Sequence, residues 1–170
     1  MMVAHHSDDL VQITEATASD VLGIQNVMQA SWQSVYADLL SEEHIARTLR
    51  RSFSEAALAR SVNHAGATYL VAWVDGEIRG MCHYGSPLLD DCENRKALYS
   101  VYVHPDWWQQ GIGTALLDVM EAHLRPQRVT DVFTYVDARN TLASTFFTRH
   151  GFVHLPDDDR DGELYLRKVL

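Results

Sequence analysis

Cysteine is scarce in this 170-residue chain, which contains only Cys82 and Cys92. The two residues are ten positions apart and do not form a CxxC pair. Two cysteines are too few for a disulfide framework, and cysteine-based zinc sites usually need closely spaced pairs. We therefore expect neither feature, and this cysteine usage predicts a cytoplasmic protein.

Long apolar runs are also absent, the longest being Tyr69 to Val74. The chain starts MMVAHHSDDL, with no cationic segment followed by an apolar stretch. Membrane helices need about 20 apolar residues, and secretion signals need an apolar segment behind a basic one. We therefore expect no membrane association and no secretion. Residues 1–9 are predicted to be disordered and residues 10–170 to form a single domain.

Positively charged residues are few: the chain has 14 basic and 23 acidic side chains, and its formal net charge is −9. No concentrated basic patch offsets this balance, so we expect no nucleic-acid partner. Asp157, Asp159 and Asp161 resemble the start of a calcium-binding loop, but the twelfth position is Lys168 instead of glutamate. A turn between strands explains these residues better, and no metal is predicted.

The pattern of apolar residues predicts strands and helices in the order βααα, βββ, αβαββ. Ser41 and Ser54 have the character of helix caps, and Asp75-Gly76 is typical of a tight hairpin turn. Helical spacing of apolar residues is expected to continue as far as Leu39. Further segments are predicted as a strand over 97–103, a helix from just after Gly113, a strand over 129–136, a helix over 140–150 and a last strand over 164–169.

The segment Val101 to Leu117 reads VYVHPDWWQQGIGTALL and predicts a strand, a turn containing Gly111 and Gly113, and a helix without acidic residues in its first turn. Free main-chain N–H groups at such a helix start suit an anion such as a pyrophosphate. A glycine-containing turn without a ligand would give the same pattern. The Rossmann fingerprint fails, because its third glycine is Leu116 here, and the Walker pattern fails as well.

This segment resembles the acetyl-CoA-binding motif of the GNAT superfamily, in which a strand ending V-x-P precedes Q/R-x-x-G-x-G/A and a helix. The matching residues are Val103, Pro105, Gly111, Gly113, Leu116 and Leu117. The family's Gln or Arg is replaced by Trp108. A second segment, NTLASTFFTRHGF, is similar to the family's N-x-x-A-x-x-[LF]-Y-x-x-x-G-F at Asn140, Ala143, Phe146, Gly151 and Phe152. A helix cap at Asn140 and core packing at Phe146 are the alternative interpretations.

The resemblance implies an α/β (α+β) fold with a mixed, largely antiparallel central sheet flanked by helices. It implies an N-acetyltransferase that transfers an acetyl group from acetyl-CoA directly to a primary amine, in a small molecule or at a protein N-terminus. Homodimers are common in the family, so the resemblance leaves the oligomeric state open between a monomer and a homodimer. The implied cofactor-binding residues are Val101, Tyr102, Val103, Gln109, Gln110, Gly111, Ile112, Gly113, Thr114, Asn140, Phe146 and Phe147.

Three positions depart from the catalytic pattern of the family. Phe147 stands where many members have a tyrosine that protonates the CoA thiolate, while Tyr135 and Ala97 replace glutamates. These departures leave open an alternative, a module that binds acyl-CoA for a regulatory or assembly role with little turnover.

Replacement proton carriers are expected among His83, Tyr99 and Tyr135, with the acidic loop Asp90, Asp91 and Glu93 as a further possibility. Trp32 and Tyr36 lie four residues apart and could line an amine pocket, although core packing explains them equally well.

Overall fold

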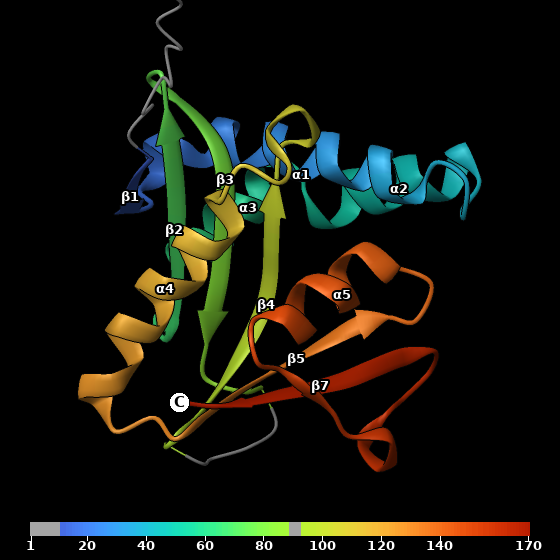
Figure 1. Ribbon diagram of the computed structural model, residues 1–170. Coiled ribbons are helices and arrows are strands. Elements are labelled where there is room, and N and C mark those ends of the chain that lie inside the picture. Colours follow the sequence, from blue (N-terminus) through green and yellow to red (C-terminus); the bar gives the residue numbers. More distant parts are fainter. Residues whose placement is uncertain (1–10, 89–92) are drawn as a thin grey trace, which may run out of the picture.

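In the computed structural model, which describes residues 11–88 and 93–170, the strands form one sheet in the order β1-β2-β3-β4-β5-β7-β6 (Figure 1). All pairs of neighbouring strands are antiparallel except β4–β5. The mixed, largely antiparallel sheet is thereby confirmed. The disorder predicted for residues 1–9 lies outside the described residues. The strands are β1 (Gln12–Glu15), β2 (Ala67–Val74), β3 (Glu77–Gly85), β4 (Arg95–Val103), β5 (Asp131–Asp137), β6 (Val153–His154) and β7 (Glu163–Val169).

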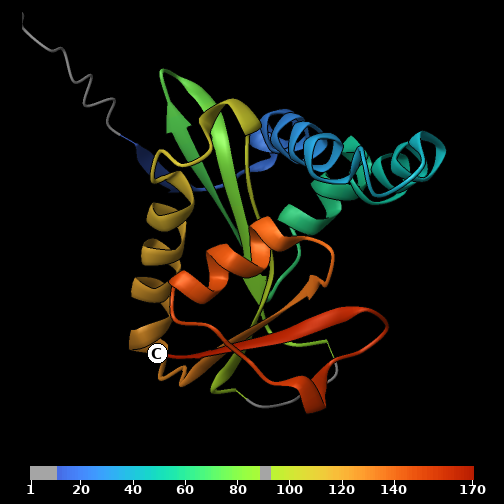
Figure 2. The ribbon, with the colours of Figure 1, turned by 45° about the vertical axis from the view of Figure 1, so that its right-hand side comes forward.

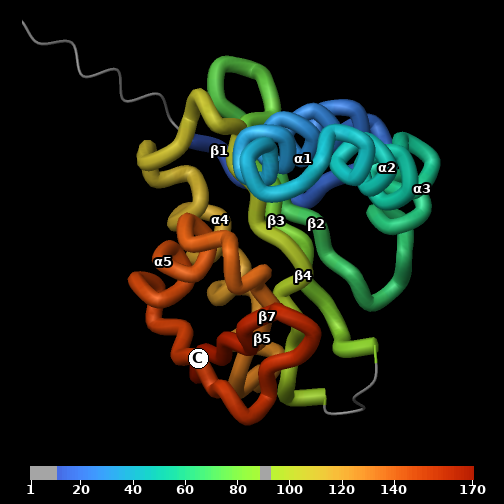
Figure 3. Tube along the Cα trace, turned by 90° about the vertical axis from the view of Figure 1, so that its right-hand side faces the viewer, coloured from blue at the N-terminus to red at the C-terminus, as the bar shows by residue number. Residues whose placement is uncertain are grey.

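Five α-helices in the described part of the chain cover the two faces of this sheet. Three helices lie on one side, and α4 and α5 lie on the other (Figures 1 and 3). None of these helices is long and apolar enough to cross a membrane. The helices are α1 (Val21–Tyr36), α2 (Glu42–Ser52), α3 (Glu55–Val62), α4 (Ile112–Leu124) and α5 (Thr141–Arg149).

Local sequence signals explain most of the element ends. The Ser41 hydroxyl accepts a hydrogen bond from the His44 N–H at the start of α2, and Ser54 does the same at the start of α3. Asp75 and Gly76, with φ of 52° and 76°, form the turn between β2 and β3. Both cap predictions and the hairpin prediction are confirmed.

Four predicted boundaries were wrong by at least two residues, among them the start of β4, which lies at Arg95 instead of residue 97. The first helix ends at Tyr36, so Leu39 lies in the following turn and is 39% exposed. Helix α4 begins at Ile112, before Gly113, and β5 begins at Asp131, two residues later than expected. End positions are the least constrained part of a periodic pattern, because apolar residues can continue past the last hydrogen-bonded turn.

The sheet separates two hydrophobic cores. The apolar stripe of α4, which includes Leu116, Leu117 and Met120, packs with strand residues such as Leu70 and Val132. The second core lies under α1 and α3 and is made by residues that include Val21, Ile24, Val27, Tyr69 and Met81. The cores place α4 and α1 on opposite faces of the sheet.

Candidate functional site

Strands β4 and β5 diverge after a short parallel pairing, as Figure 1 shows. They pair only over Arg95–Ala97 and Asp131–Phe133, and β4 then continues to Val103 along β3. Tyr99 is an extra residue in β4, because His83 pairs with Ser100 while Tyr84 pairs with Leu98.

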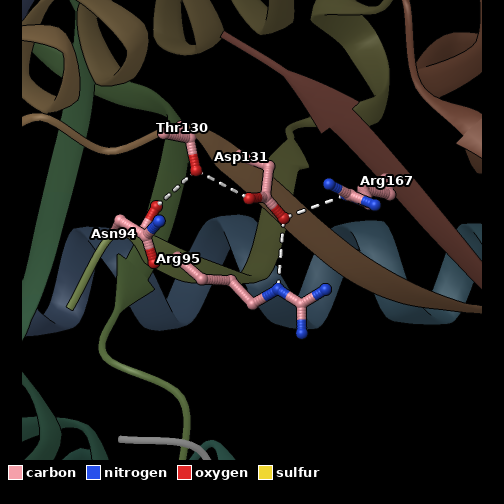
Figure 4. A network of polar contacts seen from close by, with 5 residues as sticks. All are labelled: Asn94, Arg95, Thr130, Asp131 and Arg167. Carbon is pink, nitrogen blue, oxygen red and sulfur yellow. Dashed lines mark hydrogen bonds and ion pairs between the residues drawn. The ribbon is translucent and has the colours of Figure 1, made fainter. Parts of the chain in front are cut away.

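A cluster of polar residues holds these strands together where they pair. Asp131 accepts hydrogen bonds from Arg95 and Arg167 on the two neighbouring strands and from Thr130 (Figure 4). Burial by itself raises the pKa of Asp131, but the hydrogen bonds from Arg95 and Thr130 and the charges of both arginines outweigh it. The pKa of this carboxyl therefore lies below its usual value. The charged cluster connects β4, β5 and β7 at the end where β4 and β5 still pair.

The start of α4 lies just beyond the end of β4 and has the features of an anion site. Gln109 and Gly111 adopt left-handed conformations, with φ of 62° and 84°, and α4 then begins at Ile112. Gly111 is the N-cap residue of α4, so no side chain caps this helix, and its first turn has no acidic residue. The first main-chain N–H groups of a helix have no partner within it, so they are available to an anion such as the CoA pyrophosphate.

Gly113 is explained by the packing of two helices. A Cβ atom at this position would lie 3.0 Å from the ring of Phe146 on α5. Figure 2 shows α5 running from the tip of β5 toward α4. The glycine and the aromatic residue, two separate matches to the family motifs, therefore meet in one contact that brings α5 close to the first turn of α4.

Trp108, the residue that departs from the family motif, connects the loop to the end of β4. Its indole Nε1 donates a hydrogen bond of 2.8 Å to the Val103 carbonyl. The indole is half-buried and stands at the position where the family has a Gln or Arg side chain. Nothing in the sequence indicated this bond, because Trp108 stands outside any periodic pattern.

A second contact at the start of α4 was also missed. The Thr114 hydroxyl lies 2.9 Å from His150 Nε2, and His150 Nδ1 donates to the Phe146 carbonyl at 2.8 Å. His150 thus links the end of α5 to the start of α4. The two partners are 36 residues apart, and only the fold brings them together.

On the α1 side of the sheet, the structure has a cavity of about 240 Å³ next to the bulge in β4. Its lining includes Phe53, Tyr69, His83, Tyr99 and Tyr102. The His83 ring stacks on Tyr69 with ring centroids 4.0 Å apart, and Tyr99 lies 4.8 Å away on the other side. The cavity brings together two of the three predicted proton carriers, His83 and Tyr99.

Electrostatics limit what these two side chains can do. Burial, with a smaller contribution from His64, lowers the pKa of His83 to about 4. Burial raises the pKa of Tyr99, whose hydroxyl donates to the Ser86 carbonyl. His83 is therefore a neutral and weak base at neutral pH, and Tyr99 keeps its proton.

Tyr135, the third predicted proton carrier, lies in a different cluster. Arg160 stands 3.6 Å from its ring centroid, and Phe133 and Tyr165 contact its other sides. It is absent from the lining of the cavity. The structure does not bring Tyr135 together with His83 and Tyr99.

Trp32 and Tyr36 belong to α1, and their side chains contact β4 and the start of α5. Trp32 Nε1 donates to the Tyr102 hydroxyl at 3.1 Å, and the Trp32 and Tyr36 rings are 4.4 Å apart. The side chain of Asn140 lies next to the Tyr36 hydroxyl and lowers its pKa against the larger effect of burial, and the Asn140 Oδ1 atom accepts from the Ala143 N–H at 3.0 Å. Asn140 is therefore a helix cap that also contacts α1. Burial raises the pKa of Tyr102 to about 12 and also raises that of Tyr36.

The other departures from the family pattern are core residues. Phe147 is 6% exposed and packs against Phe152, and Ala97 is 5% exposed at the last β4–β5 pair. Asp90 and Asp91 lie outside the described residues, while Glu93 is exposed. The described residues contain no group of three or more His, Cys, Asp or Glu side chains that could hold a metal ion.

Comparisons with known proteins agree with this geometry. Residues 26–152 match the model of a family described as the acetyltransferase (GNAT) family. A spermidine N(1)-acetyltransferase of Thermoplasma acidophilum is 24% identical over 160 residues, which cover 92% of this chain and 94% of that protein. A mycothiol acetyltransferase of Geodermatophilus obscurus is 37% identical over 89 residues, which cover 51% of this chain and 29% of that protein.

Solved structures show the same architecture. The PaiA N-acetyltransferase of Thermoplasma acidophilum, solved in complex with coenzyme A, superposes with a TM-score of 0.86 at 21% identity, covering 94% of this chain and 99% of that one. A GCN5-related N-acetyltransferase of Rhodopseudomonas palustris superposes with a TM-score of 0.73 at 20% identity, covering 94% and 96%. At these identities the likeness establishes a shared fold.

Proposed function

The chain belongs to the acetyltransferase (GNAT) family and is an N-acetyltransferase that uses acetyl-CoA, and we propose that it acetylates a primary amine of a small molecule. The observation that carries the acetyl-CoA site in this proposal is the uncapped start of α4, which lies at the end of the strand that diverges from β5. The two curated relatives are named for small molecules, spermidine and mycothiol, which supports a small acceptor.

In this proposal the main-chain N–H groups from Gln109 to Thr114 bind the pyrophosphate, and Phe146 and Asn140 form the α5 side of the site. The main chain of Val101–Val103 pairs with the pantetheine arm, and one of its N–H groups polarises the thioester carbonyl. The cavity under α1 receives the amine. The two ligands therefore approach β4 from opposite faces of the sheet.

The reaction forms an N–C bond from the amine to the acetyl carbon and breaks the C–S bond of the thioester. The amine loses a proton, and the CoA thiolate gains one. Phe147 has no proton to give, but a thiol with a pKa of about 8.5 leaves as a thiolate near neutral pH at a cost of roughly 2 kcal/mol. Solvent can supply that proton, and holding both reactants in place can contribute about 7–11 kcal/mol.

Two further parts of the proposal concern the cellular location and the oligomeric state. The cysteine usage supports a cytoplasmic location. The half-buried Trp107, packed at the edge of a core, supports a homodimer, because indole rings are enriched at interfaces. Light scattering on the purified protein measures the oligomeric state directly.

The cofactor site is tested by calorimetric titration with acetyl-CoA and a matched pair of variants. Gln110 and Gln127 are both exposed, and each donates its side-chain amide to a carbonyl four residues earlier, at 3.2 and 2.8 Å. Gln110 precedes α4, and Gln127 follows its far end. Gln110→Glu adds a negative charge beside the proposed pyrophosphate, so affinity should fall about tenfold, the equivalent of roughly 1.4 kcal/mol.

Gln127→Glu removes the same kind of hydrogen bond and adds the same charge, so its affinity should equal that of the wild type. These substitutions are better tests than changes at the glycines, because Gly111 needs its positive φ and Gly113 contacts Phe146. An equal loss of affinity in both variants would place the anion elsewhere. Binding without release of CoA in the presence of amines would instead favour a module that does not turn over.

A further inference from the structure

Among the residues that the structure describes, the lining of the cavity under α1 contains no Asp, Glu, Lys or Arg side chain. The larger lining residues are aromatic: Phe53, Tyr69, His83, Tyr99 and Tyr102. Desolvation keeps His83 neutral, because it lowers the pKa of that ring. A cation that entered this cavity would find no opposite charge among its walls.

Most hydroxyl groups in the lining have a hydrogen-bond partner within the protein. The Ser61 and Tyr69 hydroxyls lie 2.7 Å apart, and the Tyr102 hydroxyl accepts from Trp32. The Tyr99 hydroxyl donates to the Ser86 carbonyl. The wall of the cavity therefore consists mainly of aromatic rings and hydroxyl groups.

Size and charge together narrow the acceptor. Pockets for drug-sized ligands measure about 300–1,000 Å³, so a cavity of about 240 Å³ suits a smaller molecule. One ammonium group can rest on an aromatic face, but a polyamine carries further ammonium groups. Burying such charges without a partner is strongly unfavourable.

We infer that the acceptor is a small monoamine with an aromatic or other apolar body, and that the enzyme selects it over polycationic amines. This inference rests on the proposed function, because it takes the cavity under α1 as the acceptor site. The apolar body packs against Tyr69, Tyr99 and Phe53, and the amino group faces β4. The related spermidine enzyme of Thermoplasma acidophilum makes spermidine the most informative competitor.

The test measures CoA release with 2-phenylethylamine, 1,3-diaminopropane and spermidine as acceptors. For the wild type, kcat/KM should be at least about tenfold higher for 2-phenylethylamine than for spermidine, which corresponds to roughly 1.4 kcal/mol of discrimination. Most of the difference should appear in KM, because the selection acts on binding. A higher kcat/KM for spermidine would overturn the inference while leaving the transferase activity in place.

A matched pair of variants tests whether the missing charge sets the preference. Ser52 is exposed at the end of α2 and lines the cavity, whereas Ser34 is exposed on α1 and does not. Ser52→Asp should raise the kcat/KM ratio of 1,3-diaminopropane to 2-phenylethylamine about tenfold. Ser34→Asp should leave that ratio unchanged.

Equal ratios in both variants would overturn the assignment of the cavity as the acceptor site. No CoA release with any amine, from a protein that binds acetyl-CoA, would overturn the proposed transfer reaction and this inference with it. The failures of the two proposals are thus distinguishable.

Discussion

The substitution Asp131→Asn tests the cluster that holds β4, β5 and β7 together below the proposed site. Asp131 is 6% exposed, and its Oδ1 atom accepts from Arg95 at 3.1 Å and from Arg167 at 3.0 Å. Its Oδ2 atom accepts from the Thr130 hydroxyl at 2.9 Å (Figure 4). Asparagine keeps the shape of the side chain and removes its charge from between two guanidinium groups.

The exposure of the partners decides the size of the effect. Removing one partner of a fully buried ion pair costs about 3–5 kcal/mol, and exposed pairs contribute about 0–1 kcal/mol. The side chains of Arg95 and Arg167 are 32% and 39% exposed, so water compensates part of the loss. We therefore expect the free energy of unfolding to fall by about 1–3 kcal/mol.

Urea unfolding followed by circular dichroism measures this difference, and Asp118→Asn is the control. Asp118 is an exposed residue of α4, so the control should change the free energy of unfolding by less than about 0.5 kcal/mol. An equally small change for Asp131→Asn would refute the idea that the carboxylate holds the three strands together.

The same carboxyl predicts a pH dependence. Its pKa is lower in the folded protein than in the unfolded chain, so the folded state binds this proton less tightly. The resulting stabilisation is complete above the ordinary carboxyl pKa of about 3.9 and is lost as the pH falls through the lower folded value. Between pH 6 and pH 3, the stability of wild type and Asp131→Asn should therefore converge, and a constant difference would contradict this account.

Three other predictions concern the residues around the site. Gly111→Ala should lower the free energy of unfolding by about 1 kcal/mol, because the φ of this residue is 84°. No atom lies near the new methyl group, so a clash is excluded as the cause. Unchanged urea unfolding would contradict this prediction. Trp108→Phe removes the hydrogen bond to Val103 and should weaken acetyl-CoA binding several-fold in calorimetry, since about 1 kcal/mol of loop anchoring is lost. In an NMR titration the His83 ring should remain neutral down to about pH 5, and a midpoint near 6.5 would contradict the burial argument.

Local signals in the sequence were sufficient for much of the fold. Ser41 and Ser54 cap helices through bonds to residues three positions later, and Gly151 ends α5 with a φ of 85°. Each of these features depends on a few neighbouring residues. The uncapped start of α4 was also predicted, because the glycine-containing motif lies within one strand-turn-helix segment.

Several contacts that shape the site could not be predicted from the sequence. Trp108 bonds to Val103 through a main-chain carbonyl, which any residue offers, so no residue type marks the partner. The contact of Tyr36 with Asn140 depends on how α1 crosses the sheet. Tyr135 was expected within reach of the site, and the sequence did not predict the contact of its ring with Arg160 from a later turn.

The lack of an obvious general base among the described residues is consistent with the chemistry of the cavity. An alkyl amine with a pKa of about 10 loses its proton at pH 7 at a cost of roughly 4 kcal/mol, and His83 is too weak a base to remove much of that cost. Burial in apolar surroundings lowers the pKa of an amine, by up to about 3–5 units for a fully buried lysine. An uncharged aromatic cavity therefore favours the neutral, nucleophilic form of a bound monoamine. A carboxylate in the same place would stabilise the unreactive ammonium form, so the missing charge that selects against polyamines also activates the acceptor.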